Sequence, residues 1–171
     1  MMSEKTNKLE AYSLFNGLTD SEIALICDIV SRTHVNSGTS IITEGETGDD
    51  LFLLEDGVVD IHKTLTIVMS KHDFGTKERS FIRLTGDHHP YFGEMALFGN
   101  GERSATVKAV TKCSLMVIKS GDFRTLCEKY PRIGYVIVTN IALMLSNYLR
   151  KTNEDVIKLT TALSLALSTG K

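Results

Sequence analysis

Apolar residues recur at helical spacing within the first 33 residues, in a segment that runs from Leu18 to Val30. Thr19 and Glu22 stand three residues apart at its start, which is the spacing of a capping box. In that arrangement the Thr19 hydroxyl accepts a hydrogen bond from the backbone of Glu22, and the Glu22 carboxylate accepts one from the backbone of Thr19. The pattern predicts a helix that packs against the rest of the chain and continues to about Thr33.

From His34 to about Ser120, short apolar runs alternate with Gly, Asp and Asn. Closely spaced strands with turn residues between them favour a β-roll or barrel over a parallel α/β sheet. The predicted strands are 40–42, 51–54, 58–61, 65–68, 80–84, 106–110 and 114–118. Asp56-Gly57 predicts a hairpin turn, because both residue types tolerate a positive φ. We expect the charged stretch 71–79 at the tip of a hairpin that reaches into solvent.

The pattern becomes helical again near Ser120. Ser120 and Asp122 predict the cap of a short helix that ends before Pro131, and an unbroken helical pattern then runs to about Ser168. Apolar or small residues follow spacings of 3 and 4 along this second helix: Tyr135, Val138, Ala142, Leu145, Leu149, Thr152, Val156, Leu159, Leu163 and Ala166. A helix of roughly 50 Å extends past a small domain, so this seam predicts a coiled coil between two copies of the chain. The alternative is a helix that folds back onto the β domain.

Composition agrees with a globular protein that needs no disulfides. The chain has 171 residues, of which 42% are apolar and 23% charged. Its net charge of −2 argues weakly against nucleic acid as the main partner, because neutralising phosphates calls for a basic face. The polar start lacks the apolar run of a signal peptide, and no apolar segment reaches the about 18 residues that span a membrane. We therefore expect a cytoplasmic protein that is not bound to a membrane.

The segment 92–106, with the sequence FGEMALFGNGERSAT, carries the candidate chemistry. Gly93 permits an unusual backbone, and 94–97 is a short helix start whose free N–H groups suit an anion. The later glycines of this segment turn the chain back and bring Arg103 toward the same place, where a guanidinium can capture phosphate oxygens. Ser104 can add a hydroxyl donor, and Glu94 can accept from a sugar hydroxyl. The segment predicts an anion site beside a sugar site, about a nucleotide's width apart.

The run FGEMAL, with Arg103-Ser104-Ala105-Thr106 starting nine residues after Glu94, resembles the phosphate-binding cassette of the cyclic-nucleotide-binding domain. Catabolite activator-type regulators, cyclic-nucleotide-dependent kinases and gated channels share this domain. The resemblance covers roughly residues 10 to 155. It implies a mainly β fold with flanking helices, a cyclic-nucleotide-binding β-roll (a double-stranded β-helix or jelly roll) plus a long C-terminal helix. We expect residues 1–131 to form the roll with its N-terminal helices, and residues 132–171 to form a helix for dimerisation and lid closure.

The resemblance also implies roles by position. Arg103 would pair with the cyclic phosphate, assisted by Ser104 and by backbone N–H groups around Ala96 and Ala105. Because a buried phosphate charge is costly unless it is paired, Arg103 should matter most.

Glu94 and the backbone of Gly93 would hold the ribose 2′-hydroxyl, the group that separates a ribonucleotide from a deoxyribonucleotide. The predicted ligand-binding residues are Gly93, Glu94, Met95, Ala96, Arg103, Ser104 and Ala105.

In the family, residues on the long helix close over the base. The register of this chain places Tyr148, Lys151 and Thr152 near that position, where Tyr148 can stack and Thr152 can hydrogen-bond. Members of the family that prefer guanine often carry Thr immediately after the cassette arginine. This chain has Ser104 there, which favours cAMP over cGMP as the ligand.

One departure from the family lies just before the cassette. The family usually passes directly from a Gly-Asp pair to Phe-Gly-Glu, whereas here His88-His89-Pro90-Tyr91 separates Gly86-Asp87 from it. We expect a local loop that alters access to the pocket.

Other functions account for the sequence less well. Glu94 and Arg103 can instead form an internal salt bridge in a degenerate fold, which would leave a dimeric interaction module. A transcription factor needs a helix-turn-helix after the long helix, and no second recognition helix fits beyond Asp155, so we expect no DNA binding by this chain alone. A cupin-like metal enzyme needs clustered ligands, but His88 and His89 are adjacent and would point in opposite directions on a strand.

A haem or redox sensor on the same scaffold has little support. Cys27, Cys113 and Cys127 are scattered and form no CxxC pair, which also disfavours a zinc site or a redox dithiol. The sequence therefore predicts a cyclic-nucleotide sensor that is not an enzyme and has no metal or catalytic cofactor. It would bind cAMP, pair with a second copy through its C-terminal helix, and pass the signal to a protein that the sequence does not identify.

Overall fold

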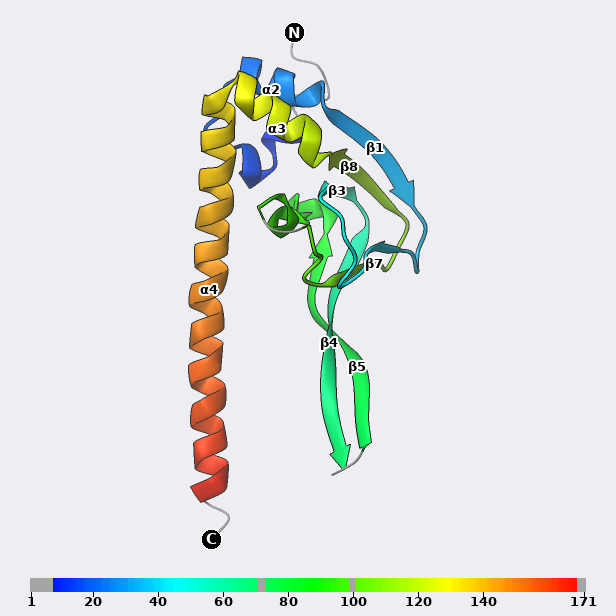
Figure 1. Ribbon diagram of the computed structural model, residues 1–171, viewed down its shortest axis with the longest axis vertical. Helices are drawn as coiled ribbons and strands as arrows, with labels where there is room; N and C mark the ends of the chain where they lie inside the picture. The colour runs from blue at the N-terminus through cyan, green and yellow to red at the C-terminus, as the bar shows by residue number, and fades with distance from the viewer. Residues whose placement is uncertain (1–7, 71–72, 99–100, 169–171) are drawn as a thin grey trace.

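The computed structural model describes residues 8–70, 73–98 and 101–168, and the side chains of these residues except 64–81 and 96. Within these ranges the chain forms two antiparallel four-stranded sheets and a set of helices on one side of them (Figure 1). The strands are β1 (Val30–Val35), β2 (Ser40–Ile42), β3 (Leu51–Asp56), β4 (Val58–Ser70), β5 (Asp73–Thr85), β6 (Tyr91–Phe92), β7 (Thr106–Ala109) and β8 (Cys113–Ile118). The helices are η1 (Ser13–Phe15), α2 (Asp20–Cys27), η2 (Gly86–His88), η3 (Glu94–Leu97), α3 (Ser120–Lys129) and α4 (Pro131–Ser168), where η marks a 3₁₀ helix.

The strand orders are β1-β8-β3-β6 and β2-β7-β4-β5, so the chain crosses repeatedly between the two sheets. One buried cluster, which includes Leu54, Val59, Phe92 and Val107, fills the space between the sheets. A second cluster packs the other face of the first sheet against the helices. The predicted fold class, a mainly β roll with flanking helices and a long C-terminal helix, is confirmed.

The predicted first helix is too long. It ends at Cys27, and the residues from Val30 onward form β1, which pairs along its whole length with β8. The side chains of β1 are mostly exposed, so this strand has no apolar run that would reveal it in the sequence. Its conformation is set by the edge of β8, a tertiary partner that overrides local pattern.

Asp56-Gly57 does not close a hairpin, contrary to the prediction. β3 pairs with β8 on one side and with β6 on the other, so neither of its edges is open to β4. The turn instead carries the chain from one sheet to the other. The predicted strands 58–61 and 65–68 are one strand, β4, and 80–84 belongs to its partner β5. Most of the stretch 71–79 also lies in β5, while residues 71–72 are outside the described residues.

The N-terminal helices are tied to the first half of α4. The predicted capping box is present, with the Thr19 N–H donating to the Glu22 carboxylate over 2.8 Å. The same carboxylate forms an ion pair with Arg132 at the start of α4. Further along α4, the Asn140 amide donates to the carbonyls of Leu14 and Asn16, each over 2.9 Å.

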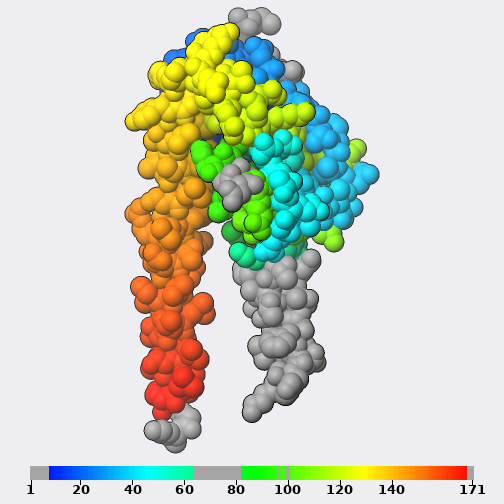
Figure 2. Space-filling view, in the orientation of Figure 1, coloured from blue at the N-terminus to red at the C-terminus, as the bar shows by residue number. Residues whose placement is uncertain are grey.

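The short helix α3 begins at Ser120, but its N-cap is Lys119 and no side chain caps it, so the predicted cap is wrong. The unbroken helix to Ser168 is confirmed as α4, 38 residues long. Ile133, Ile137 and Ile141 bury one face of its first half in the second cluster. From residue 146 onward every described residue of α4 is exposed, and this half stands clear of the roll (Figures 1 and 2).

Asp60 is 8% exposed and links β4 to β5 in the second sheet. Arg83, its cross-strand partner on β5, donates from Nε and Nη2 to the two carboxylate oxygens, each over 2.7 Å. These hydrogen bonds hold the pKa of Asp60 below its usual value. The bidentate pair fixes the register of β4 beside Ile61, which faces the candidate site.

We expect Asp60→Asn to lower the thermal midpoint by a few degrees at neutral pH, because it removes two charge-assisted hydrogen bonds. A carboxyl whose pKa is lowered by folding stabilises above its unfolded pKa of about 3.9 and loses that contribution as the pH falls through the lower folded value. The difference between native and variant should therefore shrink below about pH 4. The matched control is Asp155→Asn, which removes an exposed pair with Lys158. Equal midpoints for native and Asp60→Asn at neutral pH would show that the pair contributes nothing.

Candidate functional site

Gly93 directs the chain from β6 into η3. Its φ of 87° is in the left-handed region that residues with a Cβ rarely adopt. A Cβ at this position would also lie 2.8 Å from the Asp50 carbonyl oxygen and 2.9 Å from Nη1 of Arg103. The turn before η3 and the seat of the arginine therefore both require a glycine here.

Arg103 lies on a backbone segment that is held on both sides. Its N–H donates to the Glu46 carbonyl and its own carbonyl accepts from the Gly45 N–H, each over 2.9 Å. Thr47 and Glu102 form an antiparallel bridge next to them. The loop between β2 and β3 thus fixes where the Arg103 side chain starts.

The Arg103 side chain is largely buried, and the residue is only 8% exposed. Its Nη1 donates to the carbonyl oxygens of Asp50 (3.0 Å) and Gly93 (3.4 Å). The guanidinium carbon lies 5.8 Å from the centre of the Phe52 ring, which in turn stacks on Phe92 with ring centres 5.5 Å apart. An aromatic pair and two backbone oxygens therefore support a cation that is largely removed from solvent.

The other edge of the guanidinium keeps its donors. Within the described part of the chain, Nε and Nη2 make no hydrogen bond, and no carboxylate forms an ion pair with Arg103. Gly48 allows the loop to lie against this edge, since a Cβ there would be 3.0 Å from Nε and 3.1 Å from Nη2. The site therefore holds a largely buried positive charge whose Nε and Nη2 have no hydrogen-bond partner among the described residues.

Burial and nearby charges shift the pKa values of Arg103 and Glu94 in opposite directions. Burial lowers the pKa of Arg103, while the nearby carboxylates of Asp50, Asp49 and Glu94 raise it. Burial raises the pKa of Glu94, and its own backbone hydrogen bond and the charge of Arg103 work in the opposite direction. Glu94 is thus partly desolvated and close enough to Arg103 for the charge of the guanidinium to affect its pKa, and the two side chains form no ion pair among the described residues.

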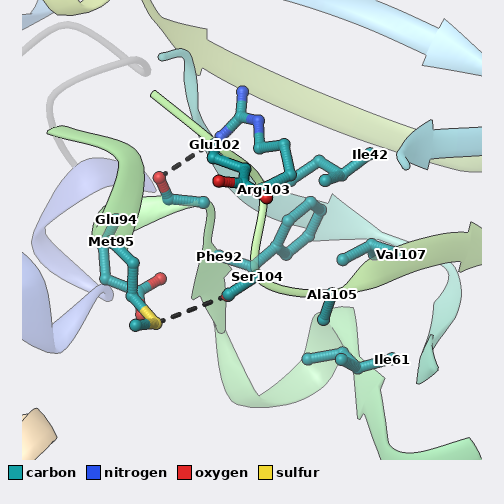
Figure 3. A pocket seen from close by; sticks show the side chains of 11 residues that line it. Ile42, Ile61, Phe92, Glu94, Met95, Glu102, Arg103, Ser104, Ala105 and Val107 are labelled. Atoms are coloured by element: carbon teal, nitrogen blue, oxygen red, sulfur yellow. Dashed lines mark hydrogen bonds between the residues drawn. The ribbon is translucent and has the colours of Figure 1, made fainter. Parts of the chain in front are cut away.

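Arg103 and Glu94 face one pocket of about 180 Å³ that is partly open to solvent (Figure 3). Six of the seven predicted ligand-binding residues line it: Gly93, Glu94, Met95, Arg103, Ser104 and Ala105. The seventh, Ala96, belongs to η3 and its side chain lies outside the described residues. Glu94 and Arg103, the two charged residues of the predicted site, are thus among the residues that line this one cavity. The role of each residue toward a ligand stays a prediction.

The predicted lid residues are elsewhere. Tyr148, Lys151 and Thr152 are exposed residues of α4 and are not among the residues that line the pocket with Arg103. The Thr152 hydroxyl donates to the Tyr148 carbonyl over 2.8 Å, one turn back along the helix. Closure of these residues over a base stays a prediction.

Sequence reasoning missed the apolar side of the pocket. Ile42, Ile61, Phe92 and Val107 line it from β2, β4, β6 and β7, and Glu102 lies at its rim. Their apolar character was visible, but the strand pairing that turns them to one cavity was not. The carbonyl of Asp50, which accepts from Arg103, carried no signal in the sequence because every residue type has a carbonyl.

The extra residues before the cassette fold against the body of the domain. Gly86–His88 forms η2, and His89 follows with a positive φ of 49°. The His89 ring packs edge-on against Tyr12, with ring centres 5.3 Å apart, and the Pro90 carbonyl accepts from the Leu54 N–H. The expected loop is therefore present, but it does not line the pocket.

The described residues lack two further kinds of feature. They contain no group of three or more His, Cys, Asp or Glu that could hold a metal ion. They also contain no helix that is both long and apolar enough to cross a membrane.

Comparison with known proteins finds relatives of this chain. A cyclic AMP receptor protein of Thermus thermophilus is 30% identical over 140 residues, which cover 82% of this chain and 58% of that protein. A cyclic nucleotide-gated potassium channel of Mesorhizobium japonicum is 30% identical over 126 residues, which cover 74% of this chain and 31% of the channel. The chain thus spans less than two thirds of each relative's length.

Solved structures agree with the sequence matches. The crystal structure of the Thermus thermophilus catabolite activator protein superposes with a TM-score of 0.71 at 28% identity, covering 86% of this chain and 63% of that one. The family model for the cyclic nucleotide-binding domain matches residues 32–130, a range that runs from within β1 to just past α3 and includes the cassette. The chain belongs to the cyclic nucleotide-binding domain family.

Proposed function

We propose that this chain is a sensor that binds cAMP, in preference to cGMP, in the pocket between Arg103 and Glu94. The observation that carries the proposal is an arginine that is 8% exposed and whose Nε and Nη2 bond to no described residue. A charge removed from water in this way is costly unless it meets an opposite charge. A singly charged cyclic phosphate supplies that charge at the open side of the pocket.

The phosphate is held by the arginine and its neighbours. Ser104 is exposed at the pocket, and among the described residues its hydroxyl makes one weak contact, 3.5 Å from the Met95 sulfur, so it can reorient toward an anion. Backbone N–H groups at Ala96, in the first turn of η3, and at Ala105 add further donors. These donors and the guanidinium together neutralise the phosphate.

The sugar and the base occupy the rest of the pocket. Glu94 accepts a hydrogen bond from the ribose 2′-hydroxyl, and the neighbouring backbone of Gly93 assists. Ile61 and Val107 offer an apolar surface to the base. Tyr148, Lys151 and Thr152 close over it from α4 when the helix approaches the roll. The base preference rests on Ser104, where relatives that prefer guanine often have Thr.

The role is one of binding rather than catalysis, and the competing functions are less well supported. A degenerate module would neutralise Arg103 internally, whereas no described carboxylate pairs with it. A metal-dependent enzyme would need a cluster of metal ligands, which the described residues lack.

The long helix is the element that transmits the signal. Along the predicted seam, Leu149, Leu159 and Leu163 are 62%, 70% and 60% exposed. Such contiguous exposed apolar side chains mark an interface. We infer that α4 pairs with α4 of a second copy, and that the nucleotide changes how the paired helices contact a further protein. The roll (1–131) would then be the binding part and residues 132–171 the transmitting part, although the first half of α4 packs into the body of the domain.

Isothermal calorimetry of the native protein with cAMP should give saturable binding, and cGMP should bind more weakly. Arg103→Ala should weaken cAMP binding by about 100-fold, since losing one partner of a buried charge pair costs roughly 2–5 kcal/mol. The matched control is Arg124→Ala, which removes an exposed arginine on α3 and should leave binding unchanged. An absence of binding by the native protein at millimolar nucleotide, or equal affinity in Arg103→Ala, contradicts the proposal.

Ligand and residue changes can be combined to test Glu94. The native protein should bind 2′-deoxy-cAMP roughly 10-fold or more weakly than cAMP, because a hydrogen bond to a charged group is lost. Glu94→Gln should weaken cAMP binding and shrink this discrimination. Burial raises the pKa of Glu94, so this carboxylate is protonated at a higher pH than an ordinary glutamate, whose pKa is about 4.3. The affinity of the native protein for cAMP should therefore fall as the pH is lowered toward the pKa of Glu94. The variant should show no such dependence, and a full 2′-hydroxyl preference in Glu94→Gln would rule out this role.

Sedimentation should report a two-chain mass for the native protein at micromolar concentration. Leu159→Lys places a charge on the seam and should shift the mass toward one chain, because a buried unpaired charge destabilises a coiled-coil interface. Thr161→Lys adds the same charge to the same helix away from the seam and serves as control. A one-chain mass for the native protein at all micromolar concentrations would refute pairing through α4.

A further inference from the structure

The two residues of β6 lie between the pocket on one face of the sheet and the helices on the other. Successive side chains of a strand point to opposite faces of the sheet. Phe92 accordingly lines the pocket and stacks on Phe52 between the sheets. Tyr91 faces the other way and packs, half-buried, against the cluster that joins the first sheet to the helices. Tyr91 thus lies on β6, the strand that leads into the cassette, but its side chain packs on the side of the sheet that the helices cover.

α4 leaves the body of the domain at this level. Asn140 ties it to η1, Ile141 is its last fully buried residue, and Leu145 still packs against the cluster. Tyr148 follows one turn later, is 50% exposed, and begins the half of the helix that nothing described covers. A small change in the direction of α4 at this point displaces the whole exposed half of the helix that follows.

Tyr91 and Tyr148 both line a groove of about 370 Å³. The groove is lined by η1, β6 and α4, with Asn140 and Met144 of α4 beside Tyr148. Burial raises the pKa of Tyr91 to about 12, and the charge of Glu94 and the phenol of Tyr148 contribute to this rise. Tyr91 therefore stands three residues before Glu94 in the chain and lines the groove where α4 leaves the domain.

We propose that Tyr91 is the positioning residue that couples the pocket to α4, by acting on Tyr148 across the groove that both residues line. The inference rests on the proposed function and adds to it the residue through which binding of a nucleotide in the pocket changes the position of α4. A nucleotide that engages Glu94 shifts η3 and the strand β6 that precedes it. Tyr91 moves with β6, and Tyr148 follows at the point where α4 becomes free.

Because α4 is long, a small tilt at Tyr148 produces a larger displacement at its C-terminal end. Ser168 lies 20 residues beyond Tyr148 in the same helix, a distance of about 30 Å. A tilt of about 5° at Tyr148 moves that end by roughly 2.5 Å on this geometry. A shift of this size repositions side chains at the seam without any change inside α4 itself.

The chain contains no tryptophan, which makes a clean reporter available. Tyr148→Trp places a single indole in the groove and keeps an aromatic ring there. We expect cAMP to change its emission saturably, with the same dissociation constant that calorimetry gives for the same variant. Glu128→Trp, on the exposed face of α3, is the matched reporter that should not respond.

Two substitutions at Tyr91 then separate coupling from binding. Tyr91→Leu keeps an apolar side chain but removes the ring, and should abolish the emission change of the Tyr148→Trp reporter while cAMP affinity stays within about threefold of the reporter parent. Tyr91→Phe keeps the ring and should restore the response, because no hydrogen bond of the Tyr91 hydroxyl occurs among the described residues. Circular dichroism confirms that each variant is folded.

The outcomes distinguish this inference from the proposed function. If cAMP does not bind to the native protein, the proposed function fails first. If cAMP binds but the emission of Tyr148→Trp does not change, or if the full change persists with Leu at position 91, the coupling role of Tyr91 is refuted while cAMP binding stands. If the Glu128→Trp reporter responds as strongly as the one at position 148, the change is global and the coupling across the groove is likewise refuted.

Discussion

The structure depends on how a β-roll accommodates one buried guanidinium. Arg103 is held by backbone oxygens and lies over the Phe52 ring, and none of the carboxylates that the structure describes forms an ion pair with it, so its charge is supported without being neutralised among these residues. A carboxylate partner would have satisfied it and closed the site to anions. Carbonyl dipoles stabilise the cation more weakly, which leaves room for a ligand to complete the pairing. The two close glycines, Gly48 and Gly93, are consequences of packing backbone against this group.

The rest of the fold links that charge to the surface. The loop 45–48 and the segment around Arg103 bind each other through backbone hydrogen bonds, so the arginine cannot shift without the loop. β6 carries the cassette on one face and Tyr91 on the other. Arg132 and Asn140 of α4 bond to the N-terminal helical segment, Arg132 to Glu22 of α2 and Asn140 to Leu14 of η1. The domain thus consists of a roll, the strand β6 at the pocket, and a helical unit whose far half is exposed.

The local chemistry of the site was readable from the sequence, and its surroundings were not. A glycine with a positive φ, a short helix and a returning arginine form one continuous segment, so Gly93, Glu94 and Arg103 could be placed together without knowledge of the sheets. Ile42, Ile61 and Val107 come from three separate strands, and only the pairing register turns them to one cavity. β1 and the Asp56-Gly57 turn were misassigned for a related reason, since both are determined by which strand edges are already occupied. The direction of α4, and with it the position of Tyr148, depends on side-chain bonds between residues far apart in the chain, such as Asn140 with Leu14.

A crystal structure of the protein with cAMP would test the central claim most directly. We predict that an exocyclic phosphate oxygen lies within hydrogen-bond distance, about 2.7–3.0 Å, of Nε or Nη2 of Arg103. The ribose 2′-hydroxyl should donate to Glu94 while the bond from Nη1 to the Asp50 carbonyl is kept. Electron density for the nucleotide at another place on the molecule, with the Arg103 guanidinium bonded only to backbone oxygens, would contradict the claim.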